Sequence, residues 1–447
     1  SVLYLRKFIL IKEIIIFLIL LPCFACAHEK NWETENRFLK IKSLENKLQV
    51  SEQSFQTVYL DKVDEKENKY VVNWLLQRPP VYKNKNFSIR FTGRIAYDYA
   101  NVSYKDGNGK NKPRNKVNSI YLRNLEFGLR GNLFSNFNYR VVTKFTDNIT
   151  ELKMAYLGYE TENTKLAIGQ TRTFTTLDKM TPPTMMAFTE RFSFINAIKA
   201  PRRLGFTASR NGSNWSFSSG YFIGNTNENK INDNRMVSAR INFSPQFKNG
   251  LSLHFGASTF YRNQNSKSFS TKYEARPLSK HGNLKPLFSG NFDIEEEQFI
   301  AAEFVASYKS FAFQVEYATI KTPLSNLELK TSTDPTYKGG YLEVGFFPTG
   351  GKQLVDGRVG RLENVKIKSP IGKGGVGEVR IAVRYDMADF THEGYGSKQS
   401  SYILSLDWYL NTVTKITTNY AHSIIQNSSN VVTVKADTIN TRFSFFF

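Results

Sequence analysis

Basic side chains recur at several places in this chain, often four residues apart. The set comprises Arg90, Arg94, Arg130, Arg140, Lys144, Arg380 and Arg384. Residues two or four positions apart in an extended strand point to the same face, so such groups form a row of cations. Guanidinium groups bind carboxylate and phosphate oxygens well, and a row of them lets an anion exchange one partner for the next. The spacing therefore predicts a path for small anions.

The same cations have a second interpretation, because acidic residues lie on the same faces. The acids concerned are Asp98, Glu126, Glu316 and Asp386. These could balance the arginines in a network of ion pairs, and both interpretations stay open at this point. The formal net charge of +21 is also compatible with attraction to nucleic acid or anionic lipid. The arginines lie in alternating strand segments, which favours neither nucleic acid nor anionic lipid as the partner of these charges. No nucleic-acid partner is predicted.

Alternating segments of eight to twelve residues must position these cations. In one, Phe87, Ile89 and Phe91 share a face opposite Arg90 and Arg94; similar alternation recurs along the chain from residue 87 onward. The chain is 14% aromatic with a mean hydropathy of −0.40, as expected when half of each strand is polar. A charge facing lipid costs about 2–4 kcal/mol at mid-bilayer, so the arginines belong in a lumen. We predict an all-β fold, a transmembrane antiparallel up-and-down β-barrel in contact with outer-membrane lipid.

The two ends of the sequence agree with export to a bacterial outer membrane. Residues Ile439, Thr441, Phe443, Phe445 and Phe447 share one face, as in the closing strand of such a barrel. Residues 1–27 combine basic residues, a short apolar run and a small-residue cleavage site, which predicts a signal peptide. The run is too short for a membrane anchor; a lipoprotein signal is a minor alternative. Both cysteines fall inside this segment, so no disulfide or thiolate metal site is predicted.

The polar stretch 28–86 precedes the alternating segments. Phe38, Ile41, Leu44 and Leu48 recur at helical spacing within it, which fits a short coiled coil. A disordered periplasmic tether is an equal alternative. Two prolines at 79 and 80 mark a domain boundary, so we predict a short periplasmic segment followed by a barrel domain over 87–447.

Several colinear blocks resemble the phosphate-selective porin O/P family. They are residues 125–131, 139–141, 151–159, 168–172, 188–191, 201–205, 215–222, 374–385 and 406–411. The resemblance implies a homotrimeric outer-membrane porin with sixteen strands that passes anions such as phosphate or polyphosphate. Met154 and the pair Thr171–Arg172 depart from the family, which commonly has an acidic residue and Phe-Lys there.

The segment 173–200 is long for a simple loop, and similar porins fold such a loop into the barrel to narrow it. We predict that Arg172, and Arg202 or Arg203, lie near the narrow zone. Glu190 and Arg191 are adjacent and could pair with each other.

Catalysis has little support in this sequence. The histidines are scattered without metal-ligand spacing, so no catalytic residue, metal or cofactor is predicted. A different function remains as an alternative, a surface barrel whose long loops act as an adhesin or receptor with little conduction. The long connections 105–116, 263–291 and 322–337 motivate it.

Overall fold

The computed structural model describes residues 81–83, 86–110, 116–146, 149–200, 202–227, 234–264, 269–325, 332–372 and 374–447. The predicted signal peptide (1–27) and most of the polar segment (28–86) lie outside these residues. Within the described part of the chain, no helix is long and apolar enough to cross a membrane.

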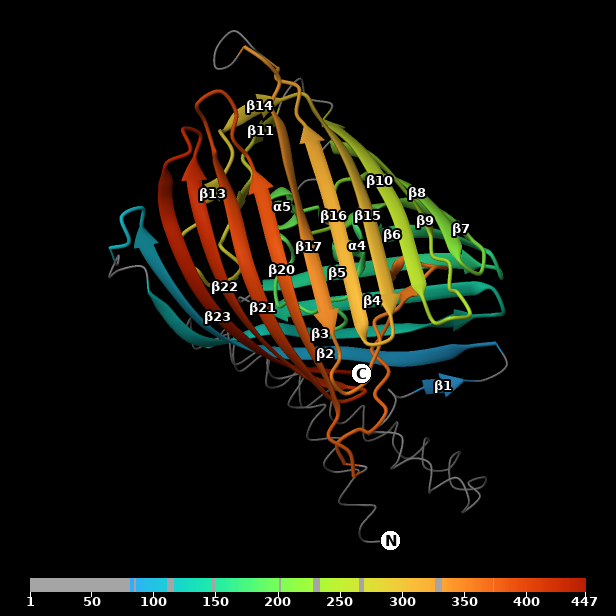
Figure 1. Cartoon of the computed structure of the whole chain (residues 1–447). Helices are drawn as coiled ribbons and strands as arrows, with labels where there is room; N and C mark the ends of the chain where they lie inside the picture. Colours follow the sequence, from blue (N-terminus) through green and yellow to red (C-terminus); the bar gives the residue numbers. More distant parts are fainter. Residues whose placement is uncertain are drawn as a thin grey trace, which may run out of the picture. The chain divides into compact units, whose positions relative to one another are not determined.

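Sixteen strands form one closed antiparallel barrel (Figure 1), which confirms the predicted fold. The strands are β2 (Ser88–Asp106), β3 (Val117–Leu133), β4 (Phe137–Thr146), β5 (Ile149–Glu160), β6 (Thr164–Thr171), β7 (Arg203–Asn211), β8 (Trp215–Ile223), β9 (Asn234–Phe243), β10 (Ser252–Gln264), β15 (Glu296–Tyr308), β16 (Phe311–Lys321), β17 (Thr336–Phe346), β20 (Glu378–Asp389), β21 (Ser397–Asn411), β22 (Thr414–Asn427) and β23 (Val432–Phe446). Each pairs with the next along the chain, and a short strand β1 (Val81–Lys83) pairs with the start of β2.

The barrel closes between its first and last strands. β2 and β23 pair from Arg94 opposite Phe446 to Asp106 opposite Val434. Gly93 and Phe447 continue the ladder, each donating its amide N–H to the other's carbonyl at 3.0 Å. The Phe447 ring fills the space that a side chain at position 93 would need. Closure leaves neither strand with an exposed edge, which a bilayer requires.

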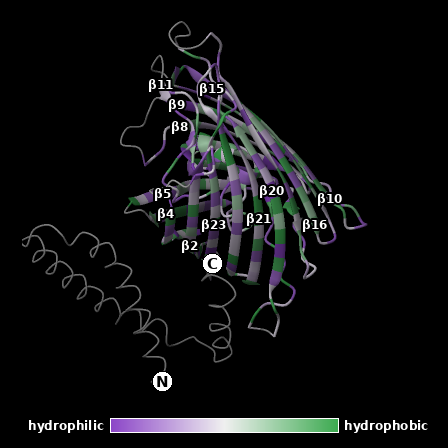
Figure 2. Ribbon diagram, turned by 60° about the vertical axis from the view of Figure 1, so that its left-hand side comes forward, coloured by the Kyte–Doolittle hydropathy of each residue, from purple (hydrophilic) through white to green (hydrophobic). Residues whose placement is uncertain are grey.

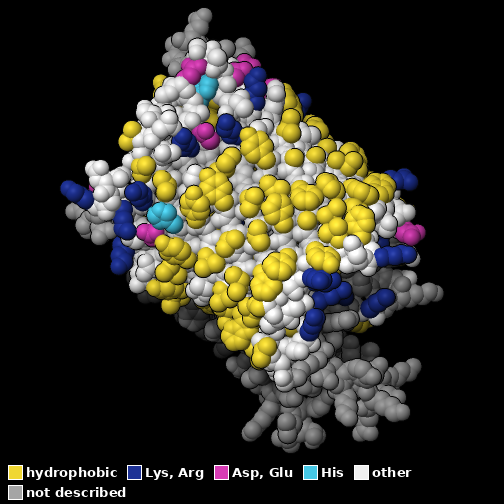
Figure 3. Space-filling model, viewed as in Figure 1, with side chains coloured by type: hydrophobic (Ala, Val, Ile, Leu, Met, Phe, Trp, Pro, Cys, Tyr) yellow, Lys and Arg dark blue, Asp and Glu magenta, His cyan; other side chains and the backbone are white. Residues whose placement is uncertain are grey.

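Strand residues alternate between an apolar outer face and a polar inner face. On β21, Tyr402, Leu404 and Leu406 are exposed on the outside, while Ser405 and Asp407 between them are buried. The same striping runs along the other strands in Figure 2. Figure 3 shows the outer side chains merging into an apolar surface over these strands. Side chains on that surface suit lipid, and those between them face the interior.

Most connections at one end of the barrel are short turns, and that end is periplasmic in barrels of this kind. Three connections carry structure of their own. These are the inner loop (172–202) with α4 (Leu177–Met180) and α5 (Ser193–Ile198), the outer loop (265–295) with β11 (Phe269–Thr271), β12 (Glu274–Ala275), β13 (Leu287–Phe288) and β14 (Phe292–Ile294), and the turn-side connection (347–377) with β18 (Val355–Asp356) and β19 (Arg361–Leu362).

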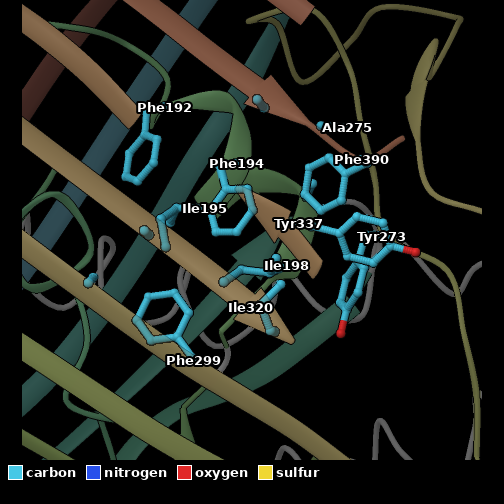
Figure 4. Packing of buried hydrophobic residues seen from close by; sticks show 14 of the residues in the cluster. Phe192, Phe194, Ile195, Ile198, Tyr273, Ala275, Phe299, Ile320, Tyr337 and Phe390 are labelled. Atoms are coloured by element: carbon cyan, nitrogen blue, oxygen red, sulfur yellow. The ribbon is translucent and has the colours of Figure 1, made fainter. Parts of the chain in front are cut away.

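The largest apolar cluster lies inside the barrel, where the inner loop packs against the strands. Phe194 of α5 stacks on Phe390 with ring centroids 5.2 Å apart. Phe299 and Ile320 belong to the same cluster, as does Tyr273 of the outer loop (Figure 4). This packing fills one side of the lumen and leaves any channel to the other side.

Candidate functional site

The inner loop is held on one wall by carboxylates that point into the barrel. The first amides of a helix lack intrahelical partners, and negative charge is favourable there. In α4 and α5 these amides donate to strand carboxylates. The pairs are Leu177 to Glu303 (2.7 Å), Asp178 to Glu316 (2.8 Å) and Ser193 to Asp386 (2.9 Å).

Carbonyl groups of the same loop are bound by donors from the last strands. The pairs are Lys415 to Met186 (2.6 Å), Ser405 to Ala187 (2.6 Å) and Arg442 to Thr189 (2.7 Å). The loop is thus fixed along the wall from β15 to β23. It covers less of the inner faces of β2 to β6, where Arg123 of β3 pairs with Glu190 of the loop and cavities remain.

Two cavities lie on this less covered side, with volumes of about 550 and 310 Å³. Both touch the inner loop and the wall of β2 to β5. They share the residues Arg94, Glu151, Lys153, Lys179, Pro183, Thr184, Arg191 and Arg202. Because they share these residues, the cavities are two adjacent chambers.

Cations dominate the lining of each cavity. Nine basic and two acidic residues line the larger one: Arg94, Arg130, Arg140, Lys153, Arg172, Lys179, Arg191, Arg202 and Arg361, with Glu126 and Glu151. The smaller one also has nine basic and two acidic residues: Arg94, Arg123, Lys144, Lys153, Lys179, Arg191, Arg202, Lys280 and Arg442, with Glu151 and Glu190. Both chambers therefore carry a large excess of positive charge.

The structure brings six of the ten residues predicted from sequence to these cavities. They are Arg94, Arg130, Arg140, Lys144, Arg172 and Arg202. Arg172 also donates to the carbonyl of Met180, which fixes its side chain within the inner loop. Arg90 stands directly opposite Arg130 across β2 and β3 but does not line either cavity.

The other three predicted residues lie where packed elements cover the wall. Arg203 donates to the carbonyl of Asn234 at 3.0 Å. Buried arginines of β20 form the ion pairs Arg380–Asp407 (2.7 Å) and Arg384–Glu343 (2.7 Å). A buried charge must be paired, and these guanidinium groups already are. None of the three lines either of the two large cavities.

Ion pairs also occur within the cavity lining, at Glu126. Its Oε1 atom accepts from Arg94 Nη2 at 2.5 Å, from Asn124 Nδ2 at 2.8 Å and from Lys153 Nζ. The adjacent residues Glu190 and Arg191 do not pair with each other. Their partners are Arg123 for Glu190 (2.9 Å) and Asp178 for Arg191 (3.1 Å).

Two cations of the site were missed because they occupy β-bulges. Lys153 has no direct partner on β4, where the register shifts between Val142 and Thr143. Arg123 of β3 likewise has no direct partner on β2, because the register shifts between Ala96 and Tyr97. A bulge inserts one residue and breaks the two-residue alternation, so counting faces from sequence misplaces the side chains beyond it.

Arg361 was missed for a different reason. It belongs to the turn-side connection, whose glycine-rich sequence indicates simple turns. The structure folds this connection inward, where Leu362 and Val355 pack against Leu177 of α4. A single sequence carries no signal for that packing.

Burial and like charge act together on the inner loop's cations. Burial, together with the positive charges of the nearby Arg191 and Arg202, lowers the pKa of Lys179 to about 7. Burial likewise lowers the pKa of Arg202 to about 10. Among the described residues, no group of three or more His, Cys, Asp and Glu side chains could hold a metal ion.

Comparison with known proteins identifies the family. An uncharacterized protein of Caulobacter vibrioides is 28% identical over 341 residues, which cover 74% of this chain and 67% of that protein. OmpT of Vibrio cholerae has a similar fold, with TM-score 0.51, 10% identity, and 82% of this chain and 100% of OmpT covered. For an anion-selective porin of Comamonas acidovorans the TM-score is 0.49, at 12% identity, covering 81% and 100% of the two chains. Residues 89–447 match the family described as phosphate-selective porin O and P, and the chain therefore belongs to this family of bacterial outer-membrane porins.

Proposed function

We propose that this porin is a passive channel that favours small anions. The observation that carries the proposal is the lining of the two adjacent cavities, where basic residues outnumber acidic ones by nine to two in each. A field of one sign in a narrow, water-filled passage concentrates ions of the opposite sign. Cations are repelled by the same groups, so the barrier for them is higher.

Conduction also needs weak, repeated binding rather than one deep site. The cavity cations come from β2 to β5, from β23, from the inner and outer loops and from the turn-side connection, so they are distributed around both cavities. An anion in the smaller cavity has Arg123 and Lys280 within reach, and one in the larger cavity has Arg130 and Arg361. Phosphate and other small oxyanions suit guanidinium groups of this kind.

Ion selectivity in planar bilayers tests the proposal. With a potassium chloride gradient across the membrane, we expect a reversal potential that reports preference for chloride. Arg202→Gln removes a cation shared by both cavities and should reduce that preference. The matched control is Arg210→Gln, because Arg210 is exposed on β7 and lines neither cavity. A cation-selective wild-type channel would contradict the proposal.

The alternative, a surface receptor with little conduction, makes an opposite prediction. Liposomes that contain the protein would then fail to swell in small solutes. Ready swelling excludes the receptor as the main function. No swelling, with folded protein verified by heat-modifiable migration, would favour it.

We also propose that the porin assembles as a homotrimer. The proposal is supported by family membership, and the structurally similar OmpT of Vibrio cholerae has been solved in a trimer form. Chemical cross-linking in membranes, followed by denaturing electrophoresis, tests it. Cross-linked species should stop at three chains; a single-chain band alone would refute the trimer.

A further inference from the structure

Glu126 is an unusual group to find on the lining of a cavity rich in cations. It projects from β3 into the larger cavity, beside Arg94 and Lys153, which line both cavities. Glu126 therefore lies beside the junction of the two cavities, the place where their linings share Arg94 and Lys153. A carboxylate at this point repels the ions that the rest of the lining attracts.

The contacts of Glu126 converge on one of its oxygens. Arg94, Asn124 and Lys153 all donate to Oε1, the first two at 2.5 and 2.8 Å. Two cationic donors and one amide around a single oxygen form the kind of site that holds an oxygen of a bound oxyanion. The side chain of Glu126 occupies that site itself.

This occupation changes what the junction can bind. With Glu126 in place, the charges of Arg94, Lys153 and Glu126 sum to a single positive charge. A passing anion must displace a tethered carboxylate to reach either cation. A tethered competitor has a high effective concentration, so an external anion binds weakly and leaves quickly.

We propose that Glu126 is a specificity-determining residue of this channel, a built-in carboxylate that keeps multiply charged oxyanions from being held at Arg94 and Lys153. The channel then favours small, singly charged anions over phosphate dianion at this point. The inference rests on the proposed anion channel and names the class of anion that passes most freely.

Glu126→Gln tests the proposal through inhibition of the chloride current by inorganic phosphate at about pH 8, where the dianion predominates. Glutamine keeps an oxygen that can accept from Arg94 and Lys153 but removes the negative charge, so a phosphate oxygen can displace it more easily. A charge-assisted hydrogen bond is worth about tenfold in affinity. Phosphate should therefore inhibit the variant at a concentration about tenfold lower than it inhibits the wild type. Equal inhibition of the two proteins would overturn the proposal.

Glu151→Gln is the matched control. Glu151 lines both cavities, and its ion-pair partner Lys144 is 3.8 Å away. Its replacement therefore removes the same negative charge from a position where two cations do not share one oxygen. It should enhance phosphate inhibition clearly less than Glu126→Gln does. Equally enhanced inhibition in both variants would mean a general charge effect and would overturn the role of Glu126.

Glu126→Asp covers the case in which the glutamine variant fails to fold. It keeps the charge but shortens the reach to Arg94 and Lys153, so inhibition should be enhanced by a smaller factor. Unchanged inhibition would overturn the proposal. The wild-type reversal potential in chloride alone separates the two ideas: cation preference refutes the anion channel, whereas anion preference without enhanced inhibition in either Glu126 variant refutes only the role of Glu126.

Discussion

We predict that Lys179 makes the proposed anion preference of this channel dependent on pH near neutrality. It extends from α4, lines both cavities and forms no ion pair in the described structure. Burial lowers its pKa to about 7, with contributions from Arg191 and Arg202. The ammonium form predominates below that pKa and the neutral amine above it. Anion preference should therefore be higher in mild acid and fall as the pH rises through about 7.

The size of the effect follows from one charge beside the passage. A unit charge about 4 Å from a passing ion contributes about 1 kcal/mol in water, which changes an ion's probability of passage about fivefold. Salt screens part of this, because the Debye length is about 10 Å at 0.1 M. At one unit below the pKa about nine in ten lysines are charged, and at one unit above about one in ten. A two- to fivefold change in permeability ratio is thus expected at low salt.

Reversal potentials at about pH 6 and pH 8, for wild type and Lys179→Gln, measure this change. The variant should show little pH dependence and should match the wild type at the higher pH. Histidines also titrate in this range, so the difference between the two proteins is the decisive quantity. Lys248→Gln, at an exposed position in the turn between β9 and β10, serves as the control and should behave as wild type. The same pH dependence in wild type and Lys179→Gln would refute the assignment to Lys179.

Three further changes test how the barrel supports the passage. Arg384→Met leaves Glu343 buried without its partner and should lower the free energy of unfolding by about 3–5 kcal/mol, measured by urea unfolding in detergent or lipid; unchanged stability would contradict the buried pair. Phe447→Ala removes the ring that packs on Gly93 at the seam between β2 and β23 and should reduce the folded fraction on heat-modifiable gels, whereas wild-type yield would show that the ring is dispensable. Arg358→Ala removes hydrogen bonds to Glu162 in the turn after β5 and to Asn211 at the end of β7. It should increase fluctuations of the single-channel current by loosening the turn-side connection that carries Arg361; fluctuations equal to those of the wild type would mean that other contacts hold this connection in place.

The sequence allowed the barrel to be predicted because lipid on one side and water on the other impose strict alternation. β21 shows this directly, since Tyr402, Leu404 and Leu406 face outward and Ser405 and Asp407 face inward, as the pattern indicates. The inward placement of Arg94, Arg130 and other cavity residues follows from the same alternation. What alternation cannot reveal is a bulge, and Arg123 and Lys153 were missed for that reason.

Alternation also cannot distinguish an arginine that lines a channel from one that anchors a packed loop. Arg94 and Arg384 both point inward from barrel strands, yet of the two only Arg94 lines the two large cavities. The difference arises from where the inner loop docks. That position is fixed by carboxylates of β15, β16 and β20 that bind backbone amides of the loop. The sequence contains those acids, but their partners come from residues more than a hundred positions away.

The charge distribution of the lumen can be understood from this docking. Acidic side chains on one wall bind arginines of neighbouring strands, as Glu343 binds Arg384, or backbone amides of the inner loop, as Asp386 binds Ser193. The opposite wall keeps its cations exposed to the passage, with few acids to balance them. A chain with an overall positive charge thus concentrates the excess where ions pass. Glu126, Glu151 and Glu190 are the acids among those cations, and Glu126 is the one whose Oε1 atom accepts from both Arg94 and Lys153. For that reason its replacement is the most direct probe of how tightly this channel binds the ions that pass.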